Sequence, residues 1–436
     1  MSTNTANLFE GFDDLFKMDI PQVKDTQKTV PSIKEVATNN SISNNKTLVV
    51  QAQAKLAAIK KEMNDLFVER DAAIDCALYA LVSEQSFLML GEPGSGKSAL
   101  AYELCNRIDN GSYFQWMLNK TSDPSELLGP YSIKEMENDK FMRVTSGKLP
   151  EANVAFVDEV FKANAPVLNI LLPIMNEKIF YNDGKPNPIP LMLFVGASNE
   201  RPEERDGLEA FYDRFLFRIN VKYVTDVVNK KRMFNNYINS RNGINGLVGK
   251  TTISIEEIKA LVEESKNIKV SKEILNNFIK FINDLNKQAI RVSDRRQNEC
   301  LKILQASAVI NGRTSVSLDD FKSLIYVLWD KEEQLQYIES IIAKLINPYD
   351  DQFTSFKNSF ASIKKDIDSC ADENEKAQKS LEGKNGIEKI TSKLNKLIND
   401  ASKNGKDITD FVKFRDDIIA YSNKIVQEAL GTSLGI

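Results

Sequence analysis

The sequence predicts an α/β protein: a parallel sheet between helices, followed by an all-α region and a C-terminal helical bundle or coiled-coil-like region. Three observations lead to this fold class. Short, nearly continuous apolar segments alternate with helical patterns in the first half of the chain. A glycine-rich turn follows one such segment, and two acidic residues follow another. Strand-like patterns then give way to helical periodicity over residues 226–346 and 351–436. Strands buried on both faces have this continuous apolar character.

The composition excludes several kinds of catalytic site. The chain has 436 residues and no histidine, and its length predicts two or three domains at about 150 residues each. Without imidazole it cannot form a Ser-His-Asp or Cys-His nucleophile, an HExxH zinc site or a histidine general base. Any catalysis must use carboxylates, lysine, arginine, hydroxyls, amides or backbone N–H groups.

The cysteines and the charge indicate the compartment and the partners. Cys76, Cys105, Cys300 and Cys370 are too far apart for a C-x2-4-C metal site. Scattered cysteines behind a start that does not resemble a signal peptide predict a cytoplasmic protein. No apolar run approaches the roughly 18 residues of a membrane span. The net charge of −4 gives no indication of nucleic-acid binding.

Residues 1–46 are predicted to be mostly unstructured, because they are rich in Asn, Thr, Ser and Lys. The exception is a short amphipathic segment, which is either an apolar part of a disordered tail or a docking peptide for a partner's groove. Its apolar face consists of Leu8, Phe9, Phe12, Leu15 and Phe16.

The central part of the chain is predicted to alternate between strands and helices. Residues 47–83 have a helical pattern, and Tyr181–Gly184 (YNDG) carries a hairpin signal. The predicted strands are Ser86–Leu90, Val154–Val157 and Leu191–Val195, with a further strand-like segment at Phe217–Val221.

The C-terminal region carries three narrow apolar seams with a 3-4 spacing. Such seams predict an antiparallel three-helix bundle or a coiled-coil arm, which is structural or partner-binding rather than catalytic. Gly383–Gly386 and Asn404–Gly405 are interpreted as the breaks between the helices. The seams are Phe353, Phe356, Phe360, Ile363, Ile367 and Cys370; Ile387, Ile390, Leu394, Leu397 and Ala401; and Phe411, Phe414, Ile418, Tyr421 and Ile425.

Gly91–Ser98 (GEPGSGKS) matches the phosphate-binding pattern G-x4-G-K-[ST] between a strand and a helix, as the motif requires. Backbone N–H groups and the helix N-terminus would surround the phosphates of ATP. Lys97 would reach the β- and γ-phosphates, and Ser98 would bind Mg²⁺. The alternative is a glycine-rich turn that binds no nucleotide. The predicted nucleotide-binding residues are Gly91, Glu92, Pro93, Gly94, Ser95, Gly96, Lys97, Ser98 and Ala99.

Polar residues follow the next two predicted strands. Asp158 and Glu159 end an apolar strand in the Walker B form, so that Asp158 would hold Mg²⁺ and Glu159 would activate the attacking water. Alternatively, the two acids only cap a helix. Asn199 follows the third strand and would hold the same water near the γ-phosphate, or it is a turn residue.

Two arginine-containing segments come later in the chain. Arg214 lies just before the strand-like segment, and Arg295 and Arg296 lie at the start of a helix. Arginine stabilises charge on a transferring phosphoryl group. A surface ion pair is the alternative for each arginine alone.

The order of these motifs resembles the AAA+ ATPases, and within them the MoxR family, most closely its RavA (regulatory ATPase variant A) branch. The similarity covers roughly residues 47–346. It rests on Leu66–Arg70, Ser122–Ile133, Gly147–Ala152, Phe156–Ala163, Leu168–Leu172, Asn176–Glu177, Gly196–Glu200, Tyr212–Phe215, Val292–Arg296 and Leu304–Ala308.

The resemblance implies a role for each of these residues. Asn199 is sensor 1, Arg214 is an arginine finger acting on a neighbour's ATP, and Arg295 is the sensor 2 arginine, a role that Arg296 could share. It also implies a homo-oligomeric ring, usually a hexamer, that remodels a protein client. RavA-like proteins typically act with a partner bearing a von Willebrand factor A domain. Because no DxSxS motif occurs in this sequence, that domain would belong to a separate chain.

The resemblance also implies a domain division. It comprises an AAA+ domain at 47–222 with a helix-2 insert at about 123–147, a lid at 223–346 and a separate C-terminal region at 351–436. The insert and the hairpin at residues 181–190 would be the moving contacts. Two other functions remain open: a nucleic-acid motor on the same core, for which no basic block with aromatics is present, and a scaffold in which nucleotide is structural.

Overall fold

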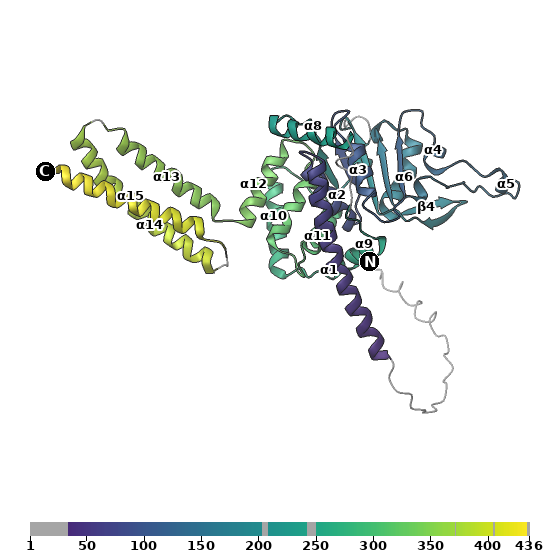
Figure 1. The fold of residues 1–436 in the computed structure, drawn as a ribbon, viewed down its shortest axis with the longest axis horizontal. Coiled ribbons are helices and arrows are strands. Elements are labelled where there is room, and N and C mark those ends of the chain that lie inside the picture. Colours follow the sequence, from purple (N-terminus) through teal and green to yellow (C-terminus); the bar gives the residue numbers. More distant parts are fainter. Residues whose placement is uncertain (1–33, 203–207, 242–249, 371, 404–405, 434–436) are drawn as a thin grey trace, which may run out of the picture. The chain divides into compact units, whose positions relative to one another are not determined.

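The structure is a computed structural model that describes residues 34–202, 208–241, 250–370, 372–403 and 406–433. Its centre is a five-stranded parallel sheet in the order β2-β3-β6-β1-β7, flanked by helices (Figure 1). The predicted parallel sheet is therefore confirmed. The strands are β1 Phe87–Leu90, β2 Tyr113–Met117, β3 Val154–Asp158, β6 Leu193–Ser198 and β7 Phe217–Asn220.

The register of the sheet places the ends of three strands together. Leu90 of β1 is paired with Ser198 of β6 on one side and with Asn220 of β7 on the other. β1, β3 and β6 are buried along almost their whole length, which explains their continuous apolar sequences. The residues that follow β1, β3 and β6 therefore meet at one edge of the sheet.

Two details of the sheet differ from the sequence prediction. β6 begins at Leu193 rather than Leu191, because its pairing with β3 starts opposite Val154, and it continues through Gly196 to Ser198. β2 was not predicted, since this edge strand is only partly buried and lacks a continuous apolar pattern.

Helices and a hairpin fill the connections of the sheet. The predicted hairpin is β4 Ile179–Asn182 and β5 Lys185–Pro188, with Asp183 and Gly184 both at positive φ, as a tight two-residue turn requires. The connecting helices are α2 Asp71–Val82, α3 Lys97–Cys105, α4 Pro124–Leu128, α5 Ile133–Met136, η1 Leu149–Glu151, η2 Val160–Lys162, α6 Ala165–Glu177 and α7 Glu209–Tyr212.

Residues 47–83 form parts of two helices rather than one. α1 covers Lys34–Leu66 and α2 begins at Asp71, with the left-handed Glu69 (φ 58°) in the break. α1 thus starts earlier than the predicted boundary at residue 47. The amphipathic segment predicted at residues 8–16 lies outside the described residues.

The all-helical region predicted after the sheet is confirmed. α9, α10 and α11 each begin with a serine whose side chain accepts a backbone N–H of the first turn, which explains their sharp starts. The helices are α8 Val227–Arg241, α9 Ile255–Asn267, α10 Lys272–Lys287, α11 Asp294–Ile310, η4 Leu318–Tyr326 and α12 Gln334–Ile346.

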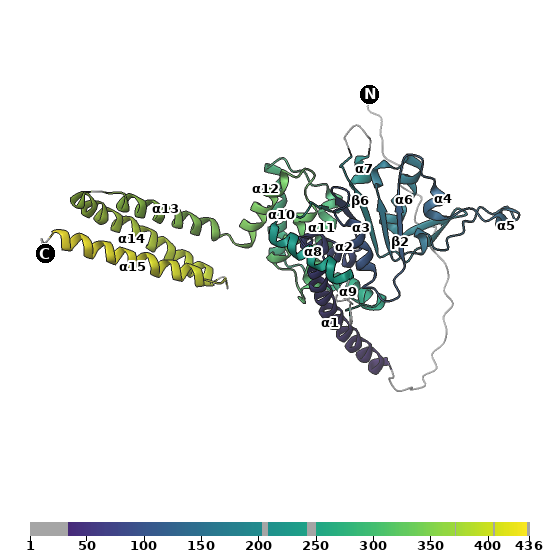
Figure 2. The same cartoon turned by 45° about the horizontal axis from the view of Figure 1, so that its top comes forward.

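The C-terminal region consists of α13 Asp350–Asp368, α14 Glu373–Lys403 and α15 Thr409–Ser433, which run side by side (Figures 1 and 2). The predicted seam residues, apart from Cys370, form a separate apolar core, in which the Phe353 and Phe411 rings lie 4.5 Å apart.

The interpretation of Gly383–Gly386 as a break between helices is wrong. α14 runs through both glycines, since α13 ends at Asp368 and α14 begins at Glu373. A Cβ at Gly383 would lie 2.8 Å from Ile367 Cδ1, and one at Gly386 would lie 2.8 Å from Ile363 Cδ1. The glycines therefore allow α13 to approach α14 closely.

Among the described residues, no helix is long and apolar enough to cross a membrane. The four cysteines are free thiols, and three of them are buried.

Candidate functional site

The glycine-rich turn between β1 and α3 has the backbone conformation of an anion-binding loop. Gly91, Gly94 and Gly96 all have positive φ, and Gly96 caps the N-terminus of α3 in the left-handed region. The first free N–H groups of α3 face this turn. The local geometry therefore suits a phosphate group.

Gly91 is required by a close approach as well as by its φ of 149°. A Cβ at this position would lie 2.2 Å from the carbonyl oxygen of Val221, which follows β7. Gly94, at φ 77°, has nothing within 4 Å of its would-be Cβ. A side chain at Gly91 would therefore cause both a steric collision and backbone strain, whereas a side chain at Gly94 would cause backbone strain alone.

We expect Gly91→Ala to lower the free energy of unfolding more than Gly94→Ala does. Both variants carry left-handed strain of about 1–2 kcal/mol, but only Gly91→Ala adds a backbone collision, worth about a further 1–3 kcal/mol. Thermal unfolding of the two full-length variants measures the difference. Equal losses would contradict the collision between Gly91 and β7.

Lys97 lies at the centre of the site. Its ammonium group donates to the carbonyl oxygens of Gly91 (2.5 Å) and Glu92 (3.2 Å), and to Asn199 Oδ1 (3.3 Å). The Lys97 residue is only 7% exposed. Burial lowers the pKa of Lys97, and the charges of Asp158 and Glu159 oppose that shift. A phosphate group in the turn would supply the buried ammonium with another negative partner.

Glu159 and Asn199 are in direct contact. Asn199 Nδ2 donates to Glu159 Oε1, which also pairs with Lys162 Nζ at 3.2 Å. The second carboxylate oxygen of Glu159 is buried with no partner among the described residues. One Asn199 amide therefore joins Lys97 to Glu159, and a free carboxylate oxygen remains beside them. The sequence did not reveal the pairing with Lys162.

Asp158, at the end of β3, accepts the Glu159 backbone N–H at 2.9 Å. Ser98 is the second residue of α3. No cluster of three or more acidic or cysteine ligands occurs in the described part of the chain. This donor set suits Mg²⁺ rather than a fully protein-ligated metal, because Mg²⁺ at phosphate sites uses one or two protein oxygens plus phosphates and water.

Two side chains that the sequence analysis did not assign support the turn. Arg70 donates to the Ser95 carbonyl oxygen from Nε (3.2 Å) and Nη2 (3.0 Å), and Tyr223 donates its hydroxyl to the Pro93 carbonyl oxygen at 2.7 Å. Both residues are distant from the turn in sequence, so the motif itself gave no signal for them.

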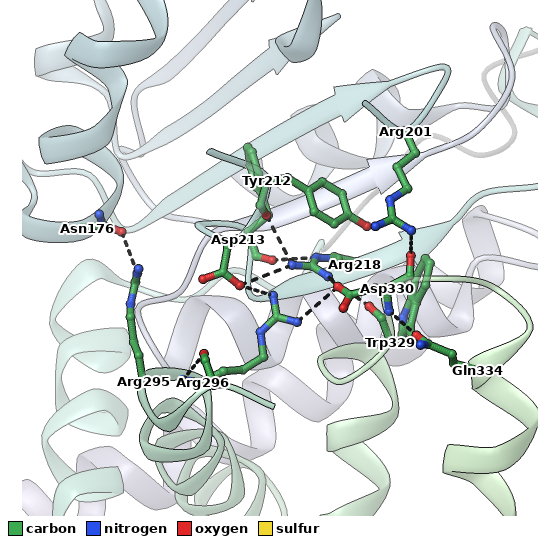
Figure 3. A network of polar contacts seen from close by, with 12 residues as sticks. Asn176, Arg201, Tyr212, Asp213, Arg218, Arg295, Arg296, Trp329, Asp330 and Gln334 are labelled. Carbon is green, nitrogen blue, oxygen red and sulfur yellow. Dashed lines mark hydrogen bonds and ion pairs between the residues drawn. The ribbon is translucent and has the colours of Figure 1, made fainter. Parts of the chain in front are cut away.

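The predicted arginines form a second group. Arg214, Arg295 and Arg296 line one depression, together with Gln85, Asp213, Leu216 and Glu299. Arg295 is exposed, and its Nη2 lies 3.4 Å from Asn176 Oδ1 (Figure 3). Arg296 is buried and donates to Asp213 at 2.8 Å. Within the described residues, no hydrogen bond or ion pair joins Arg214 or Arg295 to Lys97, Glu159 or Asn199.

A different cavity borders the phosphate-binding turn. It has a volume of about 430 Å³, and its lining includes Gly91, Glu92, Asn199, Arg201 and residues 329–333. It shares no residue with the depression around Arg214. The predicted site residues thus fall into two groups: Lys97, Glu159 and Asn199 at the turn, and the arginines elsewhere.

The strand order, the phosphate-binding turn and the following helical region together define an AAA+ ATPase fold. Residues 54–263 match a family described as the MoxR domain in MoxR-vWA-beta-propeller ternary systems, and residues 253–342 match an AAA lid domain. The crystal structure of a protein from Cytophaga hutchinsonii has the same fold, with a TM-score of 0.56 and 19% identity over 70% of this chain and 98% of that chain.

The chain also has sequence relatives of 30% to 35% identity. Two uncharacterized proteins of Methanocaldococcus jannaschii are each 35% identical to this chain. The match to the first covers 72% of this chain and 80% of the relative. The match to the second covers 78% of this chain and 89% of the relative. The chaperone MoxR1 of Mycobacterium tuberculosis is 30% identical over 37% of this chain and 43% of its own length. The chain belongs to the MoxR family of AAA+ ATPases.

Proposed function

We propose that this protein is the ATP-hydrolysing subunit of a homo-oligomeric ring. The observation that carries the proposal is the contact series Lys97–Asn199–Glu159 beside the phosphate-binding turn. It places a cation for phosphate oxygens next to a carboxylate with a free buried oxygen. Phosphoryl transfer to water needs both, and it needs no imidazole.

Each residue at the turn has a task in this proposal. The backbone of Gly91–Ala99 and the Lys97 ammonium bind the phosphates of ATP, and Ser98 and Asp158 hold Mg²⁺, which neutralises phosphate charge when bound. Glu159 Oε2 accepts a proton from the attacking water, while the Asn199 amide keeps the Glu159 carboxylate in place.

Arg214 is proposed to act as an arginine finger on the ATP of a neighbouring subunit, and Arg295 as the sensor 2 arginine. Their depression is separate from the cavity at the phosphate-binding turn, and buried Arg214 Nε has no partner among the described residues. A neighbour's γ-phosphate would supply that partner. A heterologous interface of this kind closes into a ring, and we propose a hexamer.

The partner proposals are a protein client and a separate von Willebrand factor A domain protein. The second is supported by the description of the matched family, which names such systems. We also propose that the chain lies nearest the RavA branch, that it acts in the cytoplasm, where free thiols persist, and that its domains are residues 47–222, 223–346 and 351–436, preceded by the tail at 1–46.

Lys97→Ala tests the nucleotide site. We expect the purified variant to lose measurable binding of a fluorescent ATP analogue and to lose ATP hydrolysis, because no other ammonium contacts Asn199 at the turn among the described residues. Lys120→Ala, at an exposed lysine in the loop after β2, is the matched control and should behave as wild type. Normal ATP hydrolysis by Lys97→Ala would contradict the proposed nucleotide site.

A further inference from the structure

Two buried arginines and two aspartates form a closed set of alternating charges (Figure 3), and two of the four line the same depression as Arg214. Arg218 contacts Asp330 (2.5 Å), Asp330 lies 3.6 Å from Arg296, Arg296 contacts Asp213 (2.8 Å), and Asp213 lies 4.0 Å from Arg218. We call these four residues the Arg–Asp cluster. Each charge in it faces two charges of opposite sign.

The Arg–Asp cluster joins elements that are far apart in the chain. Arg218 comes from β7, Arg296 from α11, Asp213 from the end of α7 and Asp330 from the segment between η4 and α12. The arginine side chains are only 1% and 7% exposed. Burial and, to a smaller extent, the charge of Arg296 together lower the pKa of Arg218 to about 10, against the opposing effects of Tyr212 and Asp330. Removing one carboxylate would leave buried guanidinium charges poorly compensated, so separating the members of the cluster is costly.

Arg201 connects the cluster to the nucleotide-binding turn. It lies two residues after Asn199, and its Nη1 donates to the backbone carbonyl of Asp330. Its guanidinium also lies 5.0 Å from the centre of the Tyr212 ring, which Arg218 approaches to 4.0 Å. A displacement of Asn199 would therefore be transmitted to Tyr212 and Asp330 through Arg201.

Arg214 follows directly after Asp213, which Arg296 anchors. We propose that the Arg–Asp cluster is a positioning device: through Arg201 it makes the placement of Arg214 at the neighbour's ATP depend on the nucleotide bound in its own subunit. Arg296 then positions the arginine finger rather than contacting nucleotide. The inference rests on the proposed function of Arg214, and it adds Arg201, Arg296, Asp330 and Arg218 as positioning residues.

Asp330→Asn tests the cluster, because it removes one charge with little change of shape. We expect ATP-analogue affinity within about twofold of wild type, and a hydrolysis rate lowered about 10-fold to 100-fold, as for a misplaced catalytic group. Mixing Asp330→Asn subunits with Glu159→Gln subunits should raise the rate above the sum of the two alone. A Glu159→Gln subunit lacks the proposed base but still binds ATP, so it supplies a correctly placed Arg214 to the intact site of Asp330→Asn. A variant damaged only in its own folding would not be rescued.

Asp319→Asn is the matched control, since exposed Asp319 pairs with Lys322 in the same helical turn and lies outside the Arg–Asp cluster. Arg201→Ala is the second variant, because its side chain is exposed and lies outside the cluster. It should fold normally and reduce the Hill coefficient of hydrolysis towards one. A wild-type rate for Asp330→Asn, no recovery on mixing, or a wild-type Hill coefficient for Arg201→Ala overturns the inference. If Asp330→Asn does not fold, the Hill coefficient of Arg201→Ala tests the inference by itself.

The mixing experiment also distinguishes a failure of the Arg–Asp cluster inference from a failure of the proposed action of Arg214. If Arg214→Ala and Glu159→Gln subunits complement each other but Asp330→Asn and Glu159→Gln do not, the arginine finger stands and the Arg–Asp cluster inference falls. If neither pair complements, the proposed action of Arg214 on a neighbour falls as well.

Discussion

Glu159→Gln is expected to bind ATP with near-wild-type affinity and to hydrolyse it about 10²–10⁴ times more slowly, the usual contribution of a general base. The amide oxygen of glutamine can still accept from Asn199 Nδ2, so the contact series is kept. What is lost is the carboxylate that takes the proton from water. Equilibrium binding of an ATP analogue and steady-state phosphate release measure the two effects separately.

Glu263→Gln, on an exposed face of α9, is the control and should hydrolyse ATP at the wild-type rate. In the proposed remodelling function, Glu159→Gln should also retain ATP and remain locked on its protein client. If the variant hydrolyses ATP normally, Glu159 is not the base. If hydrolysis is lost while client remodelling continues unchanged, the chain is a scaffold in which nucleotide is structural.

Arg214→Ala is expected to lower ATP hydrolysis about 10³-fold to 10⁵-fold, the range measured for arginine fingers acting in trans. The reason is that the proposed partner of its guanidinium is a neighbour's γ-phosphate. ATP binding to the variant's own site should persist, since Arg214 has no hydrogen bond to Lys97, Glu159 or Asn199 among the described residues.

Mixing two inactive variants shows whether Arg214 acts in its own subunit or on a neighbouring one. Arg214→Ala and Glu159→Gln subunits should each be nearly inactive alone, yet an equal mixture should recover activity at roughly a quarter of the sites by random assortment around a cyclic ring. Arg415→Ala, at an arginine that pairs with its sequence neighbour Asp416, is the control. The contrary outcome is that the mixture stays inactive although size measurements show that the two variants assemble together. That result would mean that Arg214 acts within its own subunit.

Local patterns in the sequence were sufficient for much of the fold. The phosphate-binding turn, the β4–β5 hairpin and the C-terminal seams are each encoded within a few residues, because backbone conformation and apolar periodicity are local properties. The interpretation of Gly383–Gly386 failed because glycine also serves close helix packing, which depends on Ile363 and Ile367 of another helix.

The sequence by itself determined the chemical groups of this protein: no imidazole, a phosphate-binding lysine candidate, and carboxylate, amide and guanidinium groups in the order typical of one family. Only the tertiary structure decided which of them meet. It joined Lys97 to Glu159 through Asn199, and it enclosed Arg296 with Arg218, Asp213 and Asp330. The physical reason is that a buried charge is stable only beside its partners, and chain folding brings those partners from positions as far as 112 residues apart.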